Sequence, residues 1–278
     1  MRARARSLPV ETPDALGIIA GGGVYPLLLA DAARKAGVKR IVAAAFTGET
    51  DPTLEQKVDA IEWMRVGQLG RMIAFLRDAA VKQGMMAGQI APKNLFDLRP
   101  DWKALLLLAR LKRRNAESIF GAIADELASV GVDLLPAFTF LENDMAPAGL
   151  IAGRPLSRRE EADAVYGFGI AKEVSRLDIG QTVIVKNGTV LAVEAFEGTN
   201  AAVQRGGHLG RKGAVMIKVA KPNQDARFDL PVIGTETVRV AAAAQIRVIA
   251  IEAGRTLLLD KAAVIALAAD SNVSLLGR

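Results

Sequence analysis

Most of the side chains that could do chemistry lie between residues 194 and 229. Glu194 and Glu197 come at the end of a predicted strand, and Lys218 lies in an otherwise apolar one. Asp225 and Arg227 follow in the block Lys-Pro-Asn-Gln-Asp-Ala-Arg-Phe-Asp. A carboxylate is costly to bury unless it is paired or bound to a metal. Oxygen ligands next to cations suit Mg²⁺ and phosphate together, although a salt-bridged surface loop is the alternative.

A glycine-rich turn near the start is the second feature. Gly21, Gly22 and Gly23 follow the buried apolar run 16–20 and precede a helical stretch over 26–35. The backbone N–H groups of such a turn can approach an anion, and a helix N-terminus adds a positive field. The spacing lacks the last glycine of a dinucleotide-binding fingerprint and the Lys-Ser/Thr of a phosphate loop. A purely structural turn is therefore the alternative.

Two more loops in the first half carry polar side chains. Gln68 lies in Gly-Gln-Leu-Gly, and Gln89 and Lys93 lie in Gly-Gln-Ile-Ala-Pro-Lys. If the sheet is parallel, these loops gather at its carboxyl edge beside the glycine turn. We therefore predict nucleotide contacts from these three side chains, with ordinary loop structure as the alternative.

The composition excludes several classes of site. The 278 residues include no Cys and one His, His208, which rules out disulfides, iron–sulfur clusters, a Cys nucleophile and a multi-histidine metal site. The longest uncharged apolar stretches, 104–109 and 262–269, are far shorter than the ~20 residues of a membrane-spanning helix. The net charge of +6 and the two Trp and two Tyr do not favour nucleic-acid binding. We expect a cytoplasmic protein.

The pattern of elements predicts an α/β fold in two domains. Buried strands, a glycine turn and helices alternate through the first half, which is typical of a parallel, Rossmann-like sheet. Its predicted elements are strands at 16–20, 39–46 and 132–140 and helices at 26–35, 69–83 and 115–130. Two Pro and two Gly among small residues mark a boundary at 145–156. We predict a flexible tail at 1–14, an N-terminal domain at 15–146, a linker at 147–156 and a C-terminal domain at 157–278.

The second half predicts a mixed α/β domain. Ser157 and Glu160 form a capping-box pattern at the start of a helix that reaches Leu177. Asn187-Gly188 between two β-rich runs, 182–186 and 189–194, predicts a type I′ hairpin. Strands are expected at 214–220, 247–252 and 255–259, with a helix at 235–244 and a last helix capped by Asp260.

Segment 101–114 allows two interpretations. Leu105 to Leu108 and Leu111 run into Lys112, Arg113 and Arg114. A basic, apolar helix can lie on a membrane surface. A packed helix whose last turn carries cations, which suit its negative end, is the alternative.

Several blocks, in order along the chain, resemble one bacterial family. They are Leu-Gly-Ile-Ile-Ala-Gly-Gly-Gly from residue 16, Gly-Gln-Leu-Gly from 67, Asp-Ile-Gly-Gln from 178, Ala-Val-Glu-Ala-Phe-Glu-Gly-Thr-Asn from 192, and Lys-Pro-x-Gln-Asp-x-Arg-Phe-Asp-x-Pro-x-Ile-Gly from 221. The chain resembles the UDP-2,3-diacylglucosamine diphosphatases of lipid A biosynthesis, of the magnesium-dependent type unrelated to the calcineurin-like enzyme.

The resemblance implies an activity. Water would cleave the diphosphate of UDP-2,3-diacylglucosamine, giving UMP and 2,3-diacylglucosamine 1-phosphate. It also implies two α/β domains with the nucleotide-linked lipid between them, a Mg²⁺ or Mn²⁺ cofactor and a homodimer. The net charge of +6 fits peripheral contact with an anionic inner membrane. A nucleotide–lipid carrier without activity and an NAD-dependent dehydrogenase are the alternatives.

The resemblance and the residue pattern together give a predicted site. Asp225 corresponds to an acid essential in the family, with Lys218 and Arg227 as further catalytic residues, and Glu194 and Glu197 join Asp225 as metal ligands. Asn200 stands where the family pattern has Asp. The predicted substrate-binding residues are Gly21, Gly22, Gly23, Tyr25, Gln68, Leu69, Gly70, Gln89, Lys93, Thr199, Asn200, Arg205, Gly206, Gly207, Lys221 and Gln224.

Overall fold

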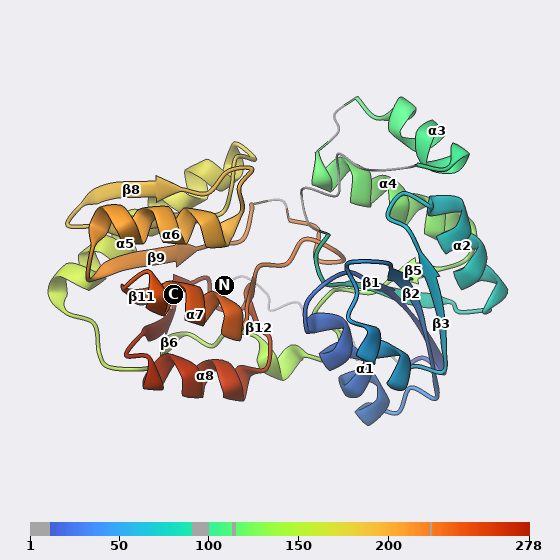
Figure 1. Ribbon diagram of the computed structural model, residues 1–278, viewed down its shortest axis with the longest axis horizontal. Coiled ribbons are helices and arrows are strands. Elements are labelled where there is room, and N and C mark those ends of the chain that lie inside the picture. The colour runs from blue at the N-terminus through green and yellow to red at the C-terminus, as the bar shows by residue number, and fades with distance from the viewer. Residues whose placement is uncertain (1–11, 91–99, 113–114, 223) are drawn as a thin grey trace, which may run out of the picture. The chain divides into compact units, whose positions relative to one another are not determined.

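The structure is a computed structural model that describes residues 12–90, 100–112, 115–222 and 224–278. The chain divides into two compact units, Met1–Leu135 and Pro136–Arg278 (Figure 1). Within the described residues, no helix is both long enough and apolar enough to cross a membrane. Each unit is an α/β structure, as the sequence predicts.

The N-terminal unit is built on a five-stranded parallel sheet in the order β3-β2-β1-β4-β5. Its elements are β1 (Ala15–Ala20), α1 (Tyr25–Lys35), β2 (Arg40–Phe46), the 3₁₀ helix η1 (Pro52–Gln56), β3 (Ala60–Met64), α2 (Leu69–Asp78), β4 (Gln83–Ala87), α3 (Trp102–Arg110), α4 (Ala116–Ser129) and β5 (Asp133–Leu134). The predicted Rossmann-like sheet is thereby confirmed. Ligands of such sheets bind at the carboxyl ends of the strands.

One face of this sheet carries an apolar core. Side chains of β1, β2 and β3 pack there against α2, α3 and α4, with Leu76 and Leu127 fully buried. Helix α1 contributes the buried Leu29 and Ala33 and contacts β1 and β4. Burial of apolar surface stabilises the fold by roughly 25 cal/mol per Å², so this packing holds the helices on the sheet.

The C-terminal unit has a six-stranded mixed sheet in the order β6-β13-β11-β9-β7-β8 and a two-stranded parallel sheet of β10 and β12. Its elements are the 3₁₀ helix η3 (Glu142–Asp144), β6 (Gly149–Ala152), α5 (Arg158–Arg176), β7 (Thr182–Lys186), β8 (Thr189–Val193), α6 (Thr199–Gly210), β9 (Ala214–Lys218), β10 (Val232–Ile233), α7 (Thr235–Ala243), β11 (Ile246–Ile251), β12 (Leu257–Leu258), α8 (Lys261–Asp270) and β13 (Ser274–Gly277). Strands β9, β11 and β13 are parallel, and β7 runs antiparallel to β8 and β9.

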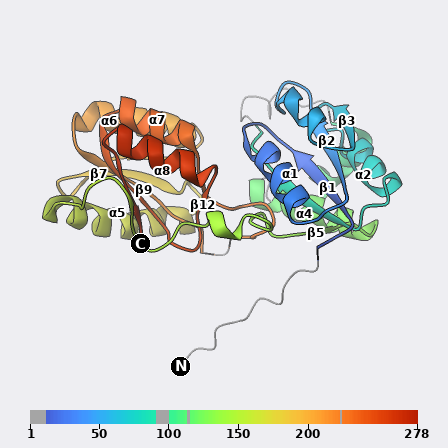
Figure 2. The ribbon, with the colours of Figure 1, turned by 90° about the horizontal axis from the view of Figure 1, so that it is seen from below.

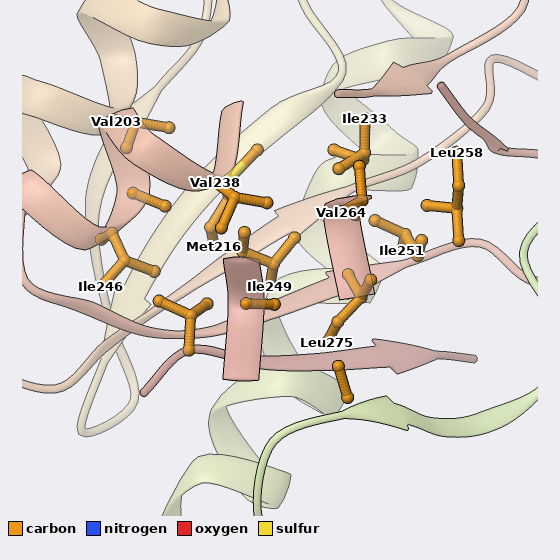
Figure 3. Close-up of a cluster of buried hydrophobic side chains, with 14 of the residues drawn as sticks. Val203, Met216, Ile233, Val238, Ile246, Ile249, Ile251, Leu258, Val264 and Leu275 are labelled. Carbon is orange, nitrogen blue, oxygen red and sulfur yellow. The ribbon is translucent and has the colours of Figure 1, made fainter. Parts of the chain in front are cut away.

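Helices cover both faces of the six-stranded sheet, as Figure 2 shows for α5 on one side and α6, α7 and α8 on the other. Met216 and Ile249 point into the core under α6, α7 and α8, where they meet Val238 and Val264 (Figure 3). Ala164 and Ala171 of α5 pack on the opposite face. The strands therefore alternate between two apolar layers.

Local signals in the sequence set several element ends as predicted. Ser157 and Glu160 form the capping box that begins α5. Asn187 and Gly188 have φ values of 50° and 72°, as a type I′ turn requires between β7 and β8. Asp260 caps α8 by accepting a hydrogen bond from the N–H of Ala263.

Other predicted elements are shorter than expected. The helix predicted to reach residue 83 ends at Asp78, because Ala80 adopts a left-handed φ of 55° that breaks the helix before β4. The strand predicted over 132–140 pairs only through Asp133 and Leu134, because Pro136 has no N–H to donate to a ladder. Of the strand predicted at 255–259, two residues pair as β12. The segment predicted as a linker, 147–156, contains β6, which pairs with β13.

Candidate functional site

The glycine turn lies at the carboxyl end of β1, and the loop after β4 packs against it. The N–H of Gly21 donates to the carbonyl of Ala87 at 2.7 Å, and Gly22 and Gln89 exchange two backbone hydrogen bonds of 2.7 and 3.2 Å. A Cβ on Gly21 would lie 2.7 Å from the Gln89 oxygen. Close approach of the two loops therefore explains Gly21. Their N–H groups bind protein backbone in this structure, so an anion contact from Gly21 or Gly22 stays a prediction.

The same unit contains a pocket that Gly23 helps to line. The pocket has a volume of about 610 Å³ and is lined by Gly23, Val24, residues 47–52 and Trp63. Its loop is held in place by Thr50, whose hydroxyl donates to the carbonyl of Ala20 and accepts the N–H of Phe46. Asp51 caps η1 by accepting the N–H of Thr53, and its hydrogen bonds to the Thr53 hydroxyl and N–H lower the pKa of the Asp51 carboxyl. Helix α1 begins here without a side-chain cap.

Most of the other predicted substrate-binding residues of this unit have structural partners. Tyr25 is buried at the start of α1, and burial raises the pKa of its hydroxyl. The Gln68 Oε1 atom accepts the N–H of Arg65, and the N–H of Gly70 donates to Asp101 Oδ2 at 2.7 Å. Leu69 is part of the core. Lys93 lies outside the described residues.

A buried chain of polar groups lies at the carboxyl end of β9 in the C-terminal unit. The Lys218 side chain, 5% exposed, directs its Nζ atom to Thr199 Oγ1 and to the carbonyl of Val232, both at 3.3 Å. The Thr199 hydroxyl donates to Glu194 Oε1 at 2.7 Å, and Glu194 is 8% exposed. Burial lowers the pKa of the Lys218 ammonium, and the charge of Glu194 opposes that shift.

Lys218 is chemically unusual because it has no carboxylate within ion-pair distance among the described residues. Its nearest polar contacts are a hydroxyl and a carbonyl. A buried ammonium is costly without a counter-ion. The geometry therefore favours an anionic group beside Lys218.

The loop between β9 and β10 carries the predicted catalytic acid. Asp225 is held by Arg227, whose Nη2 atom lies 2.7 Å from Asp225 Oδ2 and whose backbone N–H donates to Oδ1 at 3.0 Å. The hydrogen bond from the Arg227 side chain is the main reason that the pKa of Asp225 is lowered. Asp225 is thus a carboxylate at neutral pH, in a tight turn closed by the N–H of Asp229 on the Asp225 carbonyl.

Lys221 and Gln224 occupy the start of the same loop. Lys221 Nζ lies 2.6 Å from Asp178 Oδ1 and 3.7 Å from Asp229, and its backbone N–H donates to Gln224 Oε1. The Gln224 Nε2 atom is buried and has no hydrogen-bond partner among the described residues. The loop that carries Asp225 thus also carries an ammonium donor, on Lys221, and an amide donor, on Gln224.

Residues that the sequence analysis missed hold this loop in place. Glu252, at the end of β11, accepts the N–H of Ala220 at 2.8 Å and the Lys172 Nζ at 2.6 Å. Lys172 also donates to the carbonyl of Ala220, and Arg255 donates to the carbonyl of Lys221. An acid at the carboxyl end of a buried strand was the available signal, the same one that marks Glu194.

The remaining predicted residues lie along the start of α6. Glu197 pairs with Arg205 at 2.5 Å, and the hydrogen bonds to Glu197, with that of Arg205 among them, lower its pKa. Asn200 is exposed. A Cβ on Gly206 would lie 2.6 Å from Ile184, and one on Gly207 would lie 2.2 Å from the Ala244 oxygen. Close packing of α6 on β7 and α7 therefore explains both glycines.

The three carboxylates predicted as metal ligands each have another partner among the described residues. The described residues contain no group of three or more His, Asp or Glu side chains that could hold a metal ion. Glu194 is bound by Thr199, Glu197 by Arg205 and Asp225 by Arg227. The donor type suits Mg²⁺, which takes oxygen ligands and is often held by one or two carboxylates with substrate phosphates supplying the rest. The identity of the metal ligands therefore stays a prediction.

Comparison with known proteins finds one family over most of the chain. The family profile for the LpxI N-terminal domain matches residues 15–143, and that for the LpxI C-terminal domain matches 147–276. The chain is 33% identical over 273 residues to the UDP-2,3-diacylglucosamine pyrophosphatase LpxI of Caulobacter vibrioides, covering 94% of this chain and 96% of that protein. Among solved structures, the biotin carboxylase subunit of pyruvate carboxylase gives a TM-score of 0.28 at 13% identity, over 66% of this chain and 38% of that one.

Proposed function

The chain belongs to the LpxI family of UDP-2,3-diacylglucosamine pyrophosphatases, and on that basis we propose that it hydrolyses UDP-2,3-diacylglucosamine to UMP and 2,3-diacylglucosamine 1-phosphate in lipid A biosynthesis. The observation that carries the proposal is the buried Lys218 ammonium, which lacks a carboxylate partner among the described residues. A diphosphate is the anion that this reaction would bring to it. Phosphoryl transfer depends mainly on positioning and on the neutralisation of charge.

We assign the reacting groups to the loop 221–229 and to the chain of groups that ends at Lys218. Lys218 and Lys221 would bind non-bridging oxygens of the diphosphate, and Lys218 would stabilise the charge that develops as the bridge breaks. Asp225 would accept a hydrogen bond from the attacking water and so orient it toward phosphorus. Arg227 holds the Asp225 carboxylate in place and keeps it ionised. Thr199 links Lys218 to Glu194 and fixes the direction of the ammonium.

Asp225 is the carboxylate that we propose as the protein's ligand for Mg²⁺. The ion would neutralise negative charge on the diphosphate, as oxygen-ligated metals do in phosphoryl transfer. Glu194 and Glu197 have other partners and are 8% and about one-third exposed, so we propose that they position Thr199 and Arg205. Removal of divalent metal with a chelator should stop UMP release, and adding back Mg²⁺ should restore it.

The N-terminal pocket is the proposed place for the nucleotide. Trp63 offers an aromatic face, and Glu49 and Asp51 lie on the adjoining loop, where carboxylates can accept hydrogen bonds from ribose hydroxyls. Base stacking on an aromatic side chain contributes roughly 1–3 kcal/mol. The uncapped start of α1 adds a positive field at the same place. Each of these features suits a nucleotide better than an acyl chain.

The decisive experiment measures UMP release from UDP-2,3-diacylglucosamine by the purified protein and by Asp225→Ala. Hydrolysis should fall by at least about a thousandfold in the variant, because positioning and charge at the reacting phosphorus are lost. Substrate binding, measured by calorimetry, should persist. Asp270→Ala, which removes an exposed acid at the end of α8 in the same unit, is the matched control and should retain most of the activity. Binding without UMP release by the unaltered protein would favour a nucleotide–lipid carrier instead.

The resemblance also predicts a homodimer in the cytoplasm. We keep both as parts of the proposal. Sedimentation equilibrium of the purified chain would measure the first, and fractionation of cells that express it would measure the second.

A further inference from the structure

Helix α3 exposes an apolar face to solvent. Trp102 is 74% exposed, Leu105 46% and Leu106 41%, and Ala109 is exposed as well. Their spacing of three, four and seven residues places all four on one side of the helix. Three neighbouring large apolar side chains on one turn form an exposed patch, whereas scattered single ones need no explanation.

The opposite side of α3 is already packed. Ala104 and Leu107 are buried in the core shared with α2 and α4, and Leu111 packs against it. At about 3.6 residues per turn, this buried set lies on the far side of the helix from Trp102 and Leu105. A surface helix ordinarily turns charged and polar residues outward. The outward apolar face is therefore not needed to fold the N-terminal unit, at whose edge α3 lies (Figure 1).

Cations flank the exposed face. Residues 102–112 include Lys103, Arg110 and Lys112 and no acid. Lys103 pairs with Glu126 of α4, whereas Arg110 and Lys112 form no ion pair among the described residues. Both are exposed at the end of the helix. An apolar stripe with Trp and Leu, bordered by Lys and Arg, is the pattern of a helix that lies in the interface of an anionic bilayer.

We propose that the exposed face of α3 docks the protein on an anionic membrane surface. Trp102, Leu105 and Leu106 would enter the boundary between headgroups and acyl chains, while Arg110 and Lys112 would bind lipid phosphates. A single convex helix face suits a planar surface, whereas an acyl chain bound inside a protein needs walls on several sides. The docking would bring the chain to the bilayer without a membrane-spanning helix, and it stands on observations separate from those that support hydrolysis.

Vesicle flotation of the full chain without substrate tests the proposal. The protein should float with vesicles that contain phosphatidylglycerol, float less with pure phosphatidylcholine, and be released as salt rises, because screening weakens the electrostatic part. Leu105→Glu combined with Leu106→Glu should lower binding by roughly tenfold or more, because two apolar contacts are lost and two repelled charges are gained. Arg110→Gln should lower it by a few fold.

Val165→Glu is the matched control, because Val165 is 48% exposed on a helix of the C-terminal unit. It should float like the unaltered protein, and circular dichroism should show that all variants are folded. Binding that is equal in the double variant and the unaltered protein would overturn the proposal, as would the absence of binding at low salt. A double variant that sediments as a different oligomer but floats as well as the unaltered protein would also overturn the proposal, because the exposed face would then bind a second copy of the chain.

Fluorescence gives a readout that leaves α3 unchanged. Trp63 and Trp102 are the only two tryptophans, so Trp63→Phe reports on Trp102 alone. Its emission should shift to shorter wavelength on adding anionic vesicles and should be quenched by brominated acyl chains. An emission maximum that stays at the solvent-exposed position would overturn the proposal, whether or not the protein hydrolyses its substrate.

Discussion

The N-terminal and C-terminal units differ in where their polar groups lie and in what those groups bind. In the N-terminal unit, the amides of the glycine turn bind backbone of the next loop, and the pocket beside them is lined by parts of the chain that remain partly exposed. In the C-terminal unit, charged side chains are taken into the interior: Lys218 and Glu194 are almost fully buried, and Glu252 holds the loop that carries Asp225. The first arrangement suits recognition of a ligand, and the second suits chemistry at an anion.

The two units also differ in how well a sequence motif indicates a ligand site. A glycine run invites assignment as an anion site, yet Gly21 is explained by the approach of Gln89. A lysine within an apolar strand looks out of place, and the structure keeps it buried without a carboxylate in ion-pair distance among the described residues, although Thr199 links it to Glu194. The buried lysine is therefore stronger evidence for a ligand site than the glycine run, because burying a charge costs free energy.

Lys218→Met tests the buried cation and should cause a larger loss of activity than a change at Trp63 or Glu160. Hydrolysis should fall by roughly 10²–10³-fold, the usual loss when one stabilising donor is removed from a reacting oxygen. The thermal midpoint should stay the same or rise, because a buried ammonium without a counter-ion opposes folding. Steady-state UMP release and calorimetry measure the two quantities.

Lys186→Met is the matched control for that change. Lys186 lies on β7 of the same sheet and donates only to the carbonyls of Gly210 and Lys212. It should lose some stability and keep its turnover. If both lysine variants lose activity equally, the special role of Lys218 is wrong.

Trp63→Ala tests nucleotide binding in the N-terminal pocket and should have an intermediate effect on activity. If the nucleotide stacks on Trp63, KM should rise by about tenfold with kcat nearly unchanged, as expected for roughly 1–3 kcal/mol of stacking. Trp63→Phe should restore most of the affinity because it keeps an aromatic face. A fall in kcat with KM unchanged would place Trp63 outside nucleotide binding.

Glu160→Gln should have the smallest effect and concerns stability alone. Burial by itself would raise the pKa of Glu160, but hydrogen bonds from Arg154 and Ser157 lower it to about 2 from 4.5. The carboxylate therefore stabilises the fold above pH 4.5, and that stabilisation is lost as the pH falls toward 2. Urea unfolding should show the variant about 1 kcal/mol less stable at pH 7, with the difference shrinking by pH 3.

Glu173→Gln is the control for the same helix. Its carboxylate makes an exposed pair with Arg176, and such pairs contribute little. A pH-independent difference between Glu160→Gln and the unaltered protein would show that the shape of the side chain, and not its charge, stabilises the start of α5.

Much of the fold follows from local signals. Caps at Ser157 and Asp260 and the Asn187-Gly188 turn depend on residues next to one another in the chain, so the sequence predicts them. Strands β3 and β13 were not predicted, because a strand at or near the edge of a sheet is defined by its partner: β3 by β2, and β13 by β11 and β6.

The candidate site divides in the same way. The acids and cations near Asp225 were predicted by their concentration in the sequence, and the structure brings Lys218, Thr199 and Glu194 into one chain. The three-carboxylate metal shell stays a prediction. Each of the three acids binds another side chain in the described residues, and closeness in the sequence does not tell which partner an acid takes. The roles of Glu252 and Lys172 depend on contacts between residues 80 positions apart.

The pairing of β6 with β13 has a consequence for the order in which the chain matures during its synthesis. Residues 149–152, the first strand of the C-terminal sheet, bind at its edge to residues 274–277, the last. Every strand of the N-terminal sheet has left the ribosome once Leu134 has emerged, so that unit can fold early. The C-terminal sheet must wait for its final strand, so the half that carries Asp225 is the later to become resistant to proteases in the cell.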